Sequence, residues 1–334
     1  MTTTALNAFA RSAALIGLAI AGLATPPIAA HAQTYPARPI TILVPFPPGA
    51  GPDLLARVLS EKLAPKLGEP LVVENRPGAG GLIGAGLVAK AAPDGHTLLL
   101  TPSNTIMIAP HLMAKGAGGG VDVLKDFAPI ILPATTPTVL AVNPQLGVKS
   151  TAELVALARK TPDLAYASSG NGSAMHIAGE LFKRSADVNM VHVPYKGAQP
   201  AVVAALGGEV RVLYMPLGGI VQHIRSGKLV PLGVAEKSRT GLMPDLPTLG
   251  EQGYKGVEVN AWYGVLAPAG TPPAVIARLN QEINAALQAA DVRERLSVAG
   301  MDVVGGTPAT LATEMREGYE RYGKVVRDFG IRAD

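Results

Sequence analysis

The fold of this chain is decided by one stretch, Ile40-Thr41-Ile42-Leu43-Val44-Pro45-Phe46-Pro47-Pro48-Gly49-Ala50-Gly51-Pro52-Asp53. Its first five residues are rich in β-branched and apolar side chains, which is typical of a strand buried on both faces of a parallel sheet. Three prolines then end the strand, and the glycines favour a tight turn. Apolar residues recur at helical spacing from Leu54 to Leu63, so the sequence predicts a helix that begins close to Pro52.

A strand, a glycine turn and a helix N-terminus together place free N–H groups at the carboxyl edge of a sheet. Such groups form a ready site for an anion. The alternative interpretation of this stretch alone is an ordinary connection between a strand and a helix.

The composition indicates a compact globular protein. The chain has 334 residues, of which 48% are hydrophobic, 16% are charged and 4% are aromatic. This length is enough for one large or two medium α/β domains. The formal charge of +4 is too small and too scattered for a nucleic-acid-binding surface, and few aromatic side chains are available to stack on bases.

The first 32 residues are predicted to be a cleaved secretory signal. Arg11 precedes a short apolar run, and Ala30-His31-Ala32 has the small residues of a cleavage site before Gln33. A membrane anchor is the alternative, but the run is short and no charge follows to hold it. The chain has no cysteine, which excludes disulfides and a lipid-modified N-terminal cysteine. We therefore expect a soluble periplasmic protein.

The hydrophobic pattern alternates between strands and helices along the mature chain. The predicted strands are residues 40–44, 71–74, 97–100, 127–132, 139–142, 164–167, 191–193, 210–215, 229–234 and 257–266. The predicted helices begin near residue 52 and then span residues 82–91, 151–160, 174–185, 198–206, 220–226, 272–288 and 308–329. A polar loop is expected over 101–105. The opening βαβαβ order predicts a parallel sheet with right-handed crossovers.

Two crossing segments divide this pattern into two lobes. No helix fits between the strands at 127–132 and 139–142, so the chain is expected to pass there into a second sheet. The strand at 257–266 is expected to bring it back. Lobe 1 is thus predicted to comprise 33–136 plus 258–334, and lobe 2 to comprise 137–257. The predicted hinge lies near residues 135–137 and 257–261.

The second lobe repeats the strand, glycine turn and helix pattern at Ser168-Ser169-Gly170-Asn171-Gly172-Ser173. Two such loops, one in each lobe, would face each other across a cleft. Neither contains Lys or Arg, so a carboxylate there would depend on amides, hydroxyls and water.

Enzymatic sites are poorly supported by the residues. Ser173 and His176 lie in one helical turn, but no Gly-x-Ser-x-Gly elbow is present, and a helix cap is the simpler role for such a serine. His176 and Glu180 share a helix face without a third metal ligand, which favours a solvated pair. The glycine pattern at 84–89 lies inside a predicted helix, so it is not a dinucleotide-binding turn.

Several short motifs appear in an order that resembles one family. They are Tyr35-Pro36-Ala37-Arg38-Pro39, Val73-Glu74-Asn75-Arg76-Pro77-Gly78-Ala79-Gly80-Gly81, Ala92-Pro93-Asp94-Gly95, Lys125-Asp126-Phe127-Ala128-Pro129, His192-Val193-Pro194-Tyr195-Lys196-Gly197 and Leu266-Ala267-Pro268-Ala269-Gly270-Thr271-Pro272. The whole mature chain resembles an extracytoplasmic solute receptor of the tripartite tricarboxylate transporter class, the Bug family.

The resemblance implies a two-lobed α/β periplasmic binding protein fold of type II, with a ligand cleft between the lobes. It also implies a receptor without catalysis, which delivers a small mono- or dicarboxylate, aliphatic or aromatic, to a two-component membrane permease. We further expect a monomer that binds no cofactor, metal or nucleic acid. The positions that it assigns to ligand binding are Pro48, Gly49, Ala50, Asp53, Thr101, Ser103, Ser168, Asn171, Gly172, Ser173, His176, Tyr195, Lys196 and Met215.

Three positions depart from the family pattern. Ala50 and Pro52 stand where the family usually has a glycine and a hydroxyl residue, and Pro52 also removes an N–H donor. Met215 stands where many members have an acidic residue, which favours a ligand without an ammonium group. Two other functions stay open at this stage: a periplasmic sensor for a signalling partner, and a hydrolase of small esters or amides.

Overall fold

The computed structural model describes residues 35–113, 116 and 119–332. All helices and strands named below belong to one unit, Arg38–Asp334. The predicted signal segment lies outside the described residues. Within the described part of the chain, no helix is long and apolar enough to cross a membrane.

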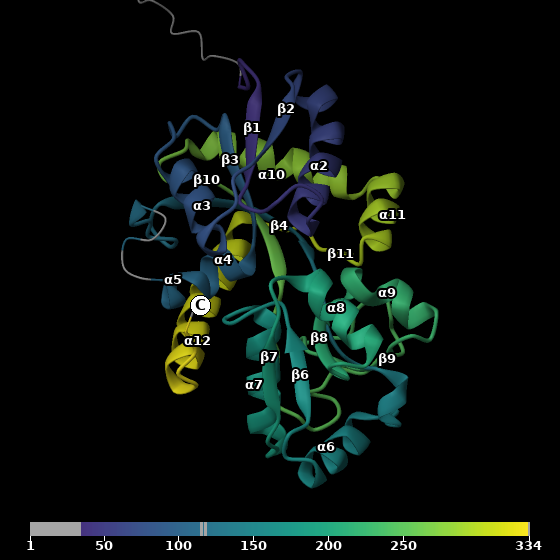
Figure 1. Ribbon diagram of the computed structural model, residues 1–334. Helices are drawn as coiled ribbons and strands as arrows, with labels where there is room; N and C mark the ends of the chain where they lie inside the picture. Colours follow the sequence, from purple (N-terminus) through teal and green to yellow (C-terminus); the bar gives the residue numbers. More distant parts are fainter. Residues whose placement is uncertain (1–34, 114–115, 117–118, 333–334) are drawn as a thin grey trace, which may run out of the picture. The chain divides into compact units, whose positions relative to one another are not determined.

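The first sheet has six strands in the order β11-β4-β10-β3-β1-β2 (Figure 1). Strand β1 pairs in parallel with β2 and β3, as the βαβαβ pattern predicts. Strand β10 lies antiparallel between β3 and β4, and β11 pairs antiparallel with β4. The strand bounds are β1 Ile40–Val44, β2 Leu71–Asn75, β3 Thr97–Pro102, β4 Phe127–Thr135, β10 Trp262–Pro268 and β11 Asp302–Val303.

The second sheet has five strands in the order β7-β6-β8-β5-β9. Strand β6 pairs in parallel with β7 and β8, whereas β5 is antiparallel to β8 and β9. The bounds are β5 Thr138–Val142, β6 Ala165–Ser168, β7 Val191–Pro194, β8 Val212–Pro216 and β9 Val230–Val234. The α/β fold of two sheets is the fold predicted from the sequence.

Helices follow most of the parallel strands. They are α2 Gly51–Leu67, α3 Leu82–Ala89, α4 Ser103–Met107, α5 Ala109–Leu112, α6 Thr151–Lys160, α7 Ala174–Ala186, α8 Ala198–Gly207, α9 Leu217–Arg225, α10 Pro273–Leu287, α11 Ala290–Val298 and α12 Pro308–Asp328, with short 3-10 turns at Ala79–Gly81 and Pro144–Leu146.

Two segments connect the sheets. The chain leaves the first sheet after Thr135 and enters the second at Thr138, which is the stretch where a crossing is predicted. It returns between the end of β9 and the start of β10. The two segments are bonded directly to each other, because the amide of Thr136 donates to the carbonyl oxygen of Ala261 at 2.8 Å.

The return segment differs from its prediction. The long strand expected over 257–266 begins only at Trp262, and the preceding residues are irregular. Val257 and Val259 are nevertheless each only 1% exposed, so their apolar character reflects core packing and not strand pairing.

Two further local predictions are wrong or incomplete. The polar loop expected over 101–105 is instead the end of β3 followed at once by α4. Helix α11 and the two-residue strand β11 were not predicted, because α11 buries only Val292 and Leu296 and therefore has almost no apolar periodicity.

Candidate functional site

The first predicted loop is held by a buried carboxylate. Asp53 lies in the first turn of α2 and is 2% exposed. One of its oxygens accepts from the Gly49 amide at 2.9 Å and from Arg57 Nε at 3.0 Å, and the other accepts from Asn75 Nδ2 at 3.0 Å. The same Asn75 amide group reaches the carbonyl oxygen of Phe46 at 2.9 Å. Asp53 therefore fixes the shape of the loop from behind.

The charge state of Asp53 follows from these contacts. Burial by itself would raise the pKa of the carboxyl group, but the hydrogen bonds from Arg57, Gly49 and Asn75 outweigh burial and lower it below its usual value. Gly49 has a φ of +81°, a conformation that suits glycine and turns its amide toward the carboxylate.

The second predicted loop joins β6 to α7. Ser173 caps α7, since its side chain accepts from the His176 amide at 3.2 Å. The amide of Gly172 donates to His176 Nδ1 at 3.1 Å. Gly170 and Gly172 have φ values of +126° and +70°, so both glycines adopt backbone conformations that other residues resist. The predicted capping role of Ser173 is confirmed.

His176 is part of a buried stack behind this loop. Its ring lies parallel to that of His192, with centroids 3.8 Å apart, and His192 Nε2 lies 2.6 Å from Ser168 Oγ. Glu180 accepts from the Tyr166 hydroxyl and from Lys183 Nζ. The predicted solvated His176–Glu180 pair is therefore wrong, since His176 is 9% exposed and the Glu180 side chain 16%.

Both loops reach one cavity of about 460 Å³. The cavity combines apolar side chains with two amide groups, two hydroxyls and backbone, and none of the described residues that line it is charged. Its lining comprises Phe46, Pro47, Ala50, Gly80, Asn104, Ala109, Leu112, Met113, Ser169, Asn171, Gly172, Ser173, Gly197 and Ala198.

The two sides of this cavity touch each other at one edge. A Cβ atom placed on Gly172 would lie 2.1 Å from Cδ1 of Leu112, which belongs to helix α5 on the first-sheet side. The loop of the second sheet therefore approaches α5 as closely as a glycine permits.

The predicted site residues fall into three groups in the structure. Ala50, Asn171, Gly172 and Ser173 line the cavity. Pro48 and Gly49 are exposed immediately before Ala50, while Tyr195 and Lys196 immediately precede Gly197. The remaining side chains are buried: Asp53, Thr101, Ser103, Ser168, His176 and Met215, of which Met215 belongs to β8 and is 0% exposed in the hydrophobic core.

Sequence reasoning missed the residues that α4 and α5 contribute. Asn104, Ala109, Leu112 and Met113 line the cavity, but the first was assigned to a loop and the other three to no element. The one available signal was the continued apolar character of 106–109 after Thr105, which is more than a surface loop needs.

This combination defines a class of protein. Two α/β sheets joined by two crossing segments, with a cavity between the carboxyl ends of their strands, form the architecture of a periplasmic solute-binding protein. Comparison with known proteins then gives the family. Residues 55–331 match the family model of the tripartite tricarboxylate transporter family receptor, and the chain belongs to this family.

Similar proteins match this chain in sequence or structure over nearly its whole length. The sequence is 40% identical to protein BugT of Bordetella pertussis over 96% of this chain and 98% of the relative. A protein of R. palustris solved with adipate is 32% identical, with a TM-score of 0.78, and the match covers 90% of this chain and all of the relative. MatC from Rhodopseudomonas palustris, solved with bound malate, is 35% identical, with a TM-score of 0.74, over 87% of this chain and all of the relative.

The family settles the broad function. The chain is a solute-binding receptor of a tripartite tricarboxylate transporter and not an enzyme. The Ser168–His192 pair accordingly has a structural role, since Ser168 is 0% exposed and has no access to a substrate.

Proposed function

We propose that the cavity between the two loops binds a small organic carboxylate, which the receptor delivers to a two-component membrane permease. The main support is that two helix N-termini meet at one cavity, because Ala50, the N-cap residue of α2, and Ser173, the N-cap residue of α7, both line it. Dicarboxylates bound to two similar proteins, adipate in one and malate in the other, favour the same ligand class here.

The lining constrains the ligand further. Ser173 and Asn171 offer polar contacts on the second-sheet side, and Asn104 offers them on the first-sheet side. Phe46, Leu112 and Met113 add apolar surface to the same lining. A mono- or dicarboxylate with an apolar body, aliphatic or aromatic, matches this arrangement better than a hydroxyl-rich one.

The proposal includes the organisation of the chain. Residues 1–32 are removed as a signal peptide, the mature protein acts in the periplasm as a monomer, and no nucleic acid is bound. Lobe 1 comprises 33–136 plus 258–334, and lobe 2 comprises 137–257. Of the predicted site, Ala50, Asn171, Gly172 and Ser173 contact the ligand, while Asp53, Thr101, Ser103, Ser168, His176 and Met215 support the loops from behind.

Mass spectrometry under native conditions on the gently purified protein tests the ligand class. A released small carboxylate, and calorimetric binding of adipate, malate or benzoate to the stripped protein, would support the proposal. Retention of a cation, or binding of none of these acids, would contradict it. Loss of uptake of the bound acid in cells that lack the receptor would show delivery to a permease.

A further inference from the structure

Helix α12 packs against the short helices α4 and α5, which form part of the cavity proposed for the ligand (Figure 1). Two glycines inside α12, Gly318 and Gly323, lie at these contacts. Glycine is unfavourable in the middle of a helix, because it loses more backbone freedom on folding than any other residue. Each of the two glycines instead provides space for a side chain of a neighbouring helix.

The space at Gly323 is filled by the ring of His111 on α5. A Cβ atom on Gly323 would lie 2.7 Å from His111 Cε1 and 3.1 Å from each ring nitrogen. His111 Nε2 donates to the carbonyl oxygen of Tyr319 at 2.9 Å, since a carbonyl oxygen can only accept. The centroids of the His111 and Tyr319 rings are 4.2 Å apart. Helix α5 is therefore attached to α12 through one hydrogen-bonded ring.

The space at Gly318 is filled by Met107, the last residue of α4. Met107 is 1% exposed, and a Cβ atom on Gly318 would overlap its Sδ atom. Thr105 of the same helix donates from Oγ1 to the carbonyl oxygen of Gly80 at 2.8 Å, and Gly80 lines the ligand cavity. Helix α12 therefore supports α4 as well as α5.

Helix α5 lies between α12 and the cavity. Ala109, Leu112 and Met113 line the cavity, and their spacing of three and four residues places them on one face of a helix. His111 follows Ala109 by two residues, about 200° around the helix axis, and therefore lies on the opposite face. A displacement of α5 away from α12 would move the cavity-lining residues inward.

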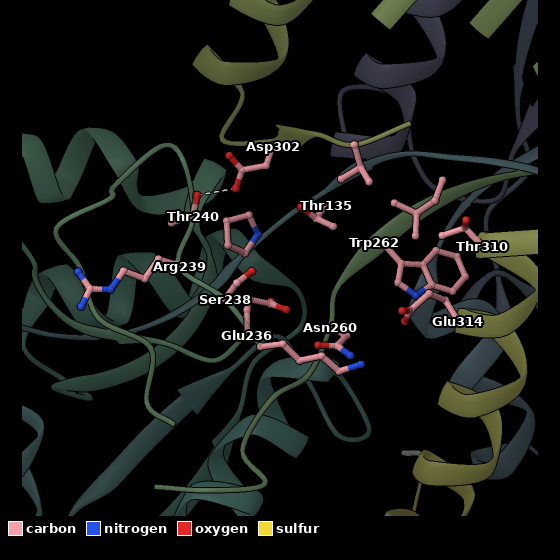
Figure 2. Close-up of a pocket in the computed structure, with 14 residues that line it drawn as sticks. Thr135, Glu236, Ser238, Arg239, Thr240, Asn260, Trp262, Asp302, Thr310 and Glu314 are labelled. Atoms are coloured by element: carbon pink, nitrogen blue, oxygen red, sulfur yellow. Dashed lines mark hydrogen bonds between the residues drawn. The ribbon is translucent and has the colours of Figure 1, made fainter. Parts of the chain in front are cut away.

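Helix α12 is also held to the segment through which the chain returns to the first sheet. The hydroxyl group of Tyr322 donates to the carbonyl oxygen of Val259 on that segment. Thr310 and Glu314 of α12 line a second cavity, of about 270 Å³, together with Trp262 at the start of β10 (Figure 2). These contacts anchor α12 independently of α4 and α5.

We propose that His111 and Gly323 are positioning residues for ligand binding: the contact of the His111 ring with α12 sets how far α5 reaches into the cavity, and so limits the length of the acid that fits. This inference rests on the proposed function, because α5 lines the cavity proposed for the carboxylate. A methyl group added at position 323 would displace the ring, which cannot fold aside as a flexible side chain can. Helix α5 would then move toward the cavity and shorten it.

The test compares wild type with Gly323→Ala and with the control Lys324→Ala, an exposed position in the same turn of α12. The probes are adipate and succinate, two straight-chain dicarboxylates of which adipate is the longer by two methylene groups. Calorimetry gives both affinities, and the NMR resonance of the Met113 ε-methyl group reports the position of α5 without ligand. In wild type, a nuclear Overhauser effect between His111 Hε1 and Gly323 Hα tests the contact without any variant.

Gly323→Ala should lower the ratio of adipate affinity to succinate affinity by about tenfold, the usual effect of one methylene group in an apolar pocket. The Met113 resonance should shift in the same variant. A loss of stability alone would leave the affinity ratio of the folded protein unchanged. Lys324→Ala should match wild type in both measurements.

The double variant His111→Ala/Gly323→Ala tests whether the two residues act through each other. The added methyl group would enter the space that the ring has left, so the double variant should bind both acids as His111→Ala does. Additive effects of the two changes, an unchanged ratio in Gly323→Ala, or no Overhauser effect in wild type would overturn the inference. If neither acid bound while the Overhauser effect and the Met113 shift were as expected, the ligand class would be wrong and the role of α12 behind α5 would stand.

Discussion

Asp53, in the first turn of α2, and Ser173, the N-cap residue of α7, perform different tasks at the two loops. Asp53 is turned back into the protein and organises its loop through Gly49, Arg57 and Asn75. Ser173 faces the cavity and at the same time caps α7. One loop is therefore shaped by a buried charge, and the other by a cap and two glycines with positive φ.

Asp53→Asn should reduce the free energy of unfolding by about 1–3 kcal/mol at neutral pH, because the new amide group faces donors from Gly49 and Arg57. The pKa of Asp53 is lowered in the folded protein, so its contribution is present above the unfolded pKa and is lost as pH falls through the folded one. Urea denaturation at neutral pH and below about pH 4 measures both effects. The exposed Asp163→Asn is the control, and an equal loss in the two variants would contradict the prediction.

Ser173→Ala should lower the free energy of unfolding by about 0.5–2 kcal/mol through loss of the cap, and should weaken ligand binding as well. Ser169→Ala is a matched control, since Ser169 lines the same cavity and its hydroxyl bonds only weakly to Met175 Sδ at 3.4 Å. Thermal unfolding and calorimetry with the identified acid compare the two. Equal stability of both variants would show that the cap contributes nothing.

At the scale of elements, α9 and the turn after α11 meet backbone to backbone. A Cβ atom on Gly218 would lie 2.1 Å from the carbonyl oxygen of Ala299, and one on Gly300 would lie 2.2 Å from Gly218 Cα. Helix α9 follows β8 of the second sheet, and α11 precedes β11 of the first. This contact therefore joins a helix that follows the second sheet to a turn that precedes the last strand of the first sheet. Backbone atoms cannot move aside for an added methyl group as a flexible side chain can.

Gly218→Ala should separate α9 from the turn at Ala299 and weaken ligand binding by about tenfold or more, since small displacements at a close-packed contact are costly. Gly219→Ala is the control on the same helix, because its Cβ would meet Met215 Cγ at an ordinary 3.5 Å. Calorimetry and small-angle scattering of both variants give the result. Similar affinities for the two would mean that the contact does not influence capture.

The elements that the sequence predicted well are those with strong periodicity and clear ends. Strand β1 was predicted to the residue, and α6 begins after Ser150, whose hydroxyl accepts from the Glu153 amide. Helix α5 and strand β11 are only four and two residues long, too short for any period to show. For the same reason, only part of the cavity lining could be predicted. Its two loops are marked in the sequence by glycines between a strand and a helix, whereas the position of α4 and α5 depends on tertiary packing.

Polar contacts between segments that are distant in the sequence carry no local signal. Glu236 follows an apolar strand and precedes a lysine, which is the pattern of a surface residue, and its side chain is partly exposed in the structure. Its contacts with Thr138 and with the return segment come from positions 98 or fewer residues away along the chain, and only the fold brings them together. The same applies to the stacking of His176 on His192.

For the whole molecule, ligand binding should bring the two sheets closer around the segments at 135–137 and 257–261. In the observed structure, elements of the first and the second sheet are in contact, because Gly172 lies close to Leu112 and Gly218 lies close to Ala299. Small-angle scattering should show a smaller radius of gyration at saturating ligand, provided that the free protein is open. An unchanged radius, with an open free state shown by distance measurements between spin labels, would contradict a hinge.

The electrostatics of capture give the last prediction. Among the described residues that line the cavity proposed for the ligand none is charged, so under the proposed function a carboxylate there would be bound by hydroxyl and amide groups, whose local fields salt screens little. Affinity should therefore change by less than about threefold when the Debye length falls from about 10 Å to about 3 Å on raising ionic strength from 0.1 M to 1 M.

Lys196, exposed beside the cavity, adds only a screened attraction, so Lys196→Ala should cost less than about 1 kcal/mol of binding free energy. Gly49→Val should cost more, because a β-branched side chain resists the φ of +81° that holds the Gly49 amide toward Asp53. Calorimetry of wild type and both variants across salt concentrations tests these expectations. The prediction would be wrong if affinity fell steeply with salt and if Lys196→Ala abolished binding while Gly49→Val did not. Side-chain charge, and not the uncharged loops, would then capture the ligand.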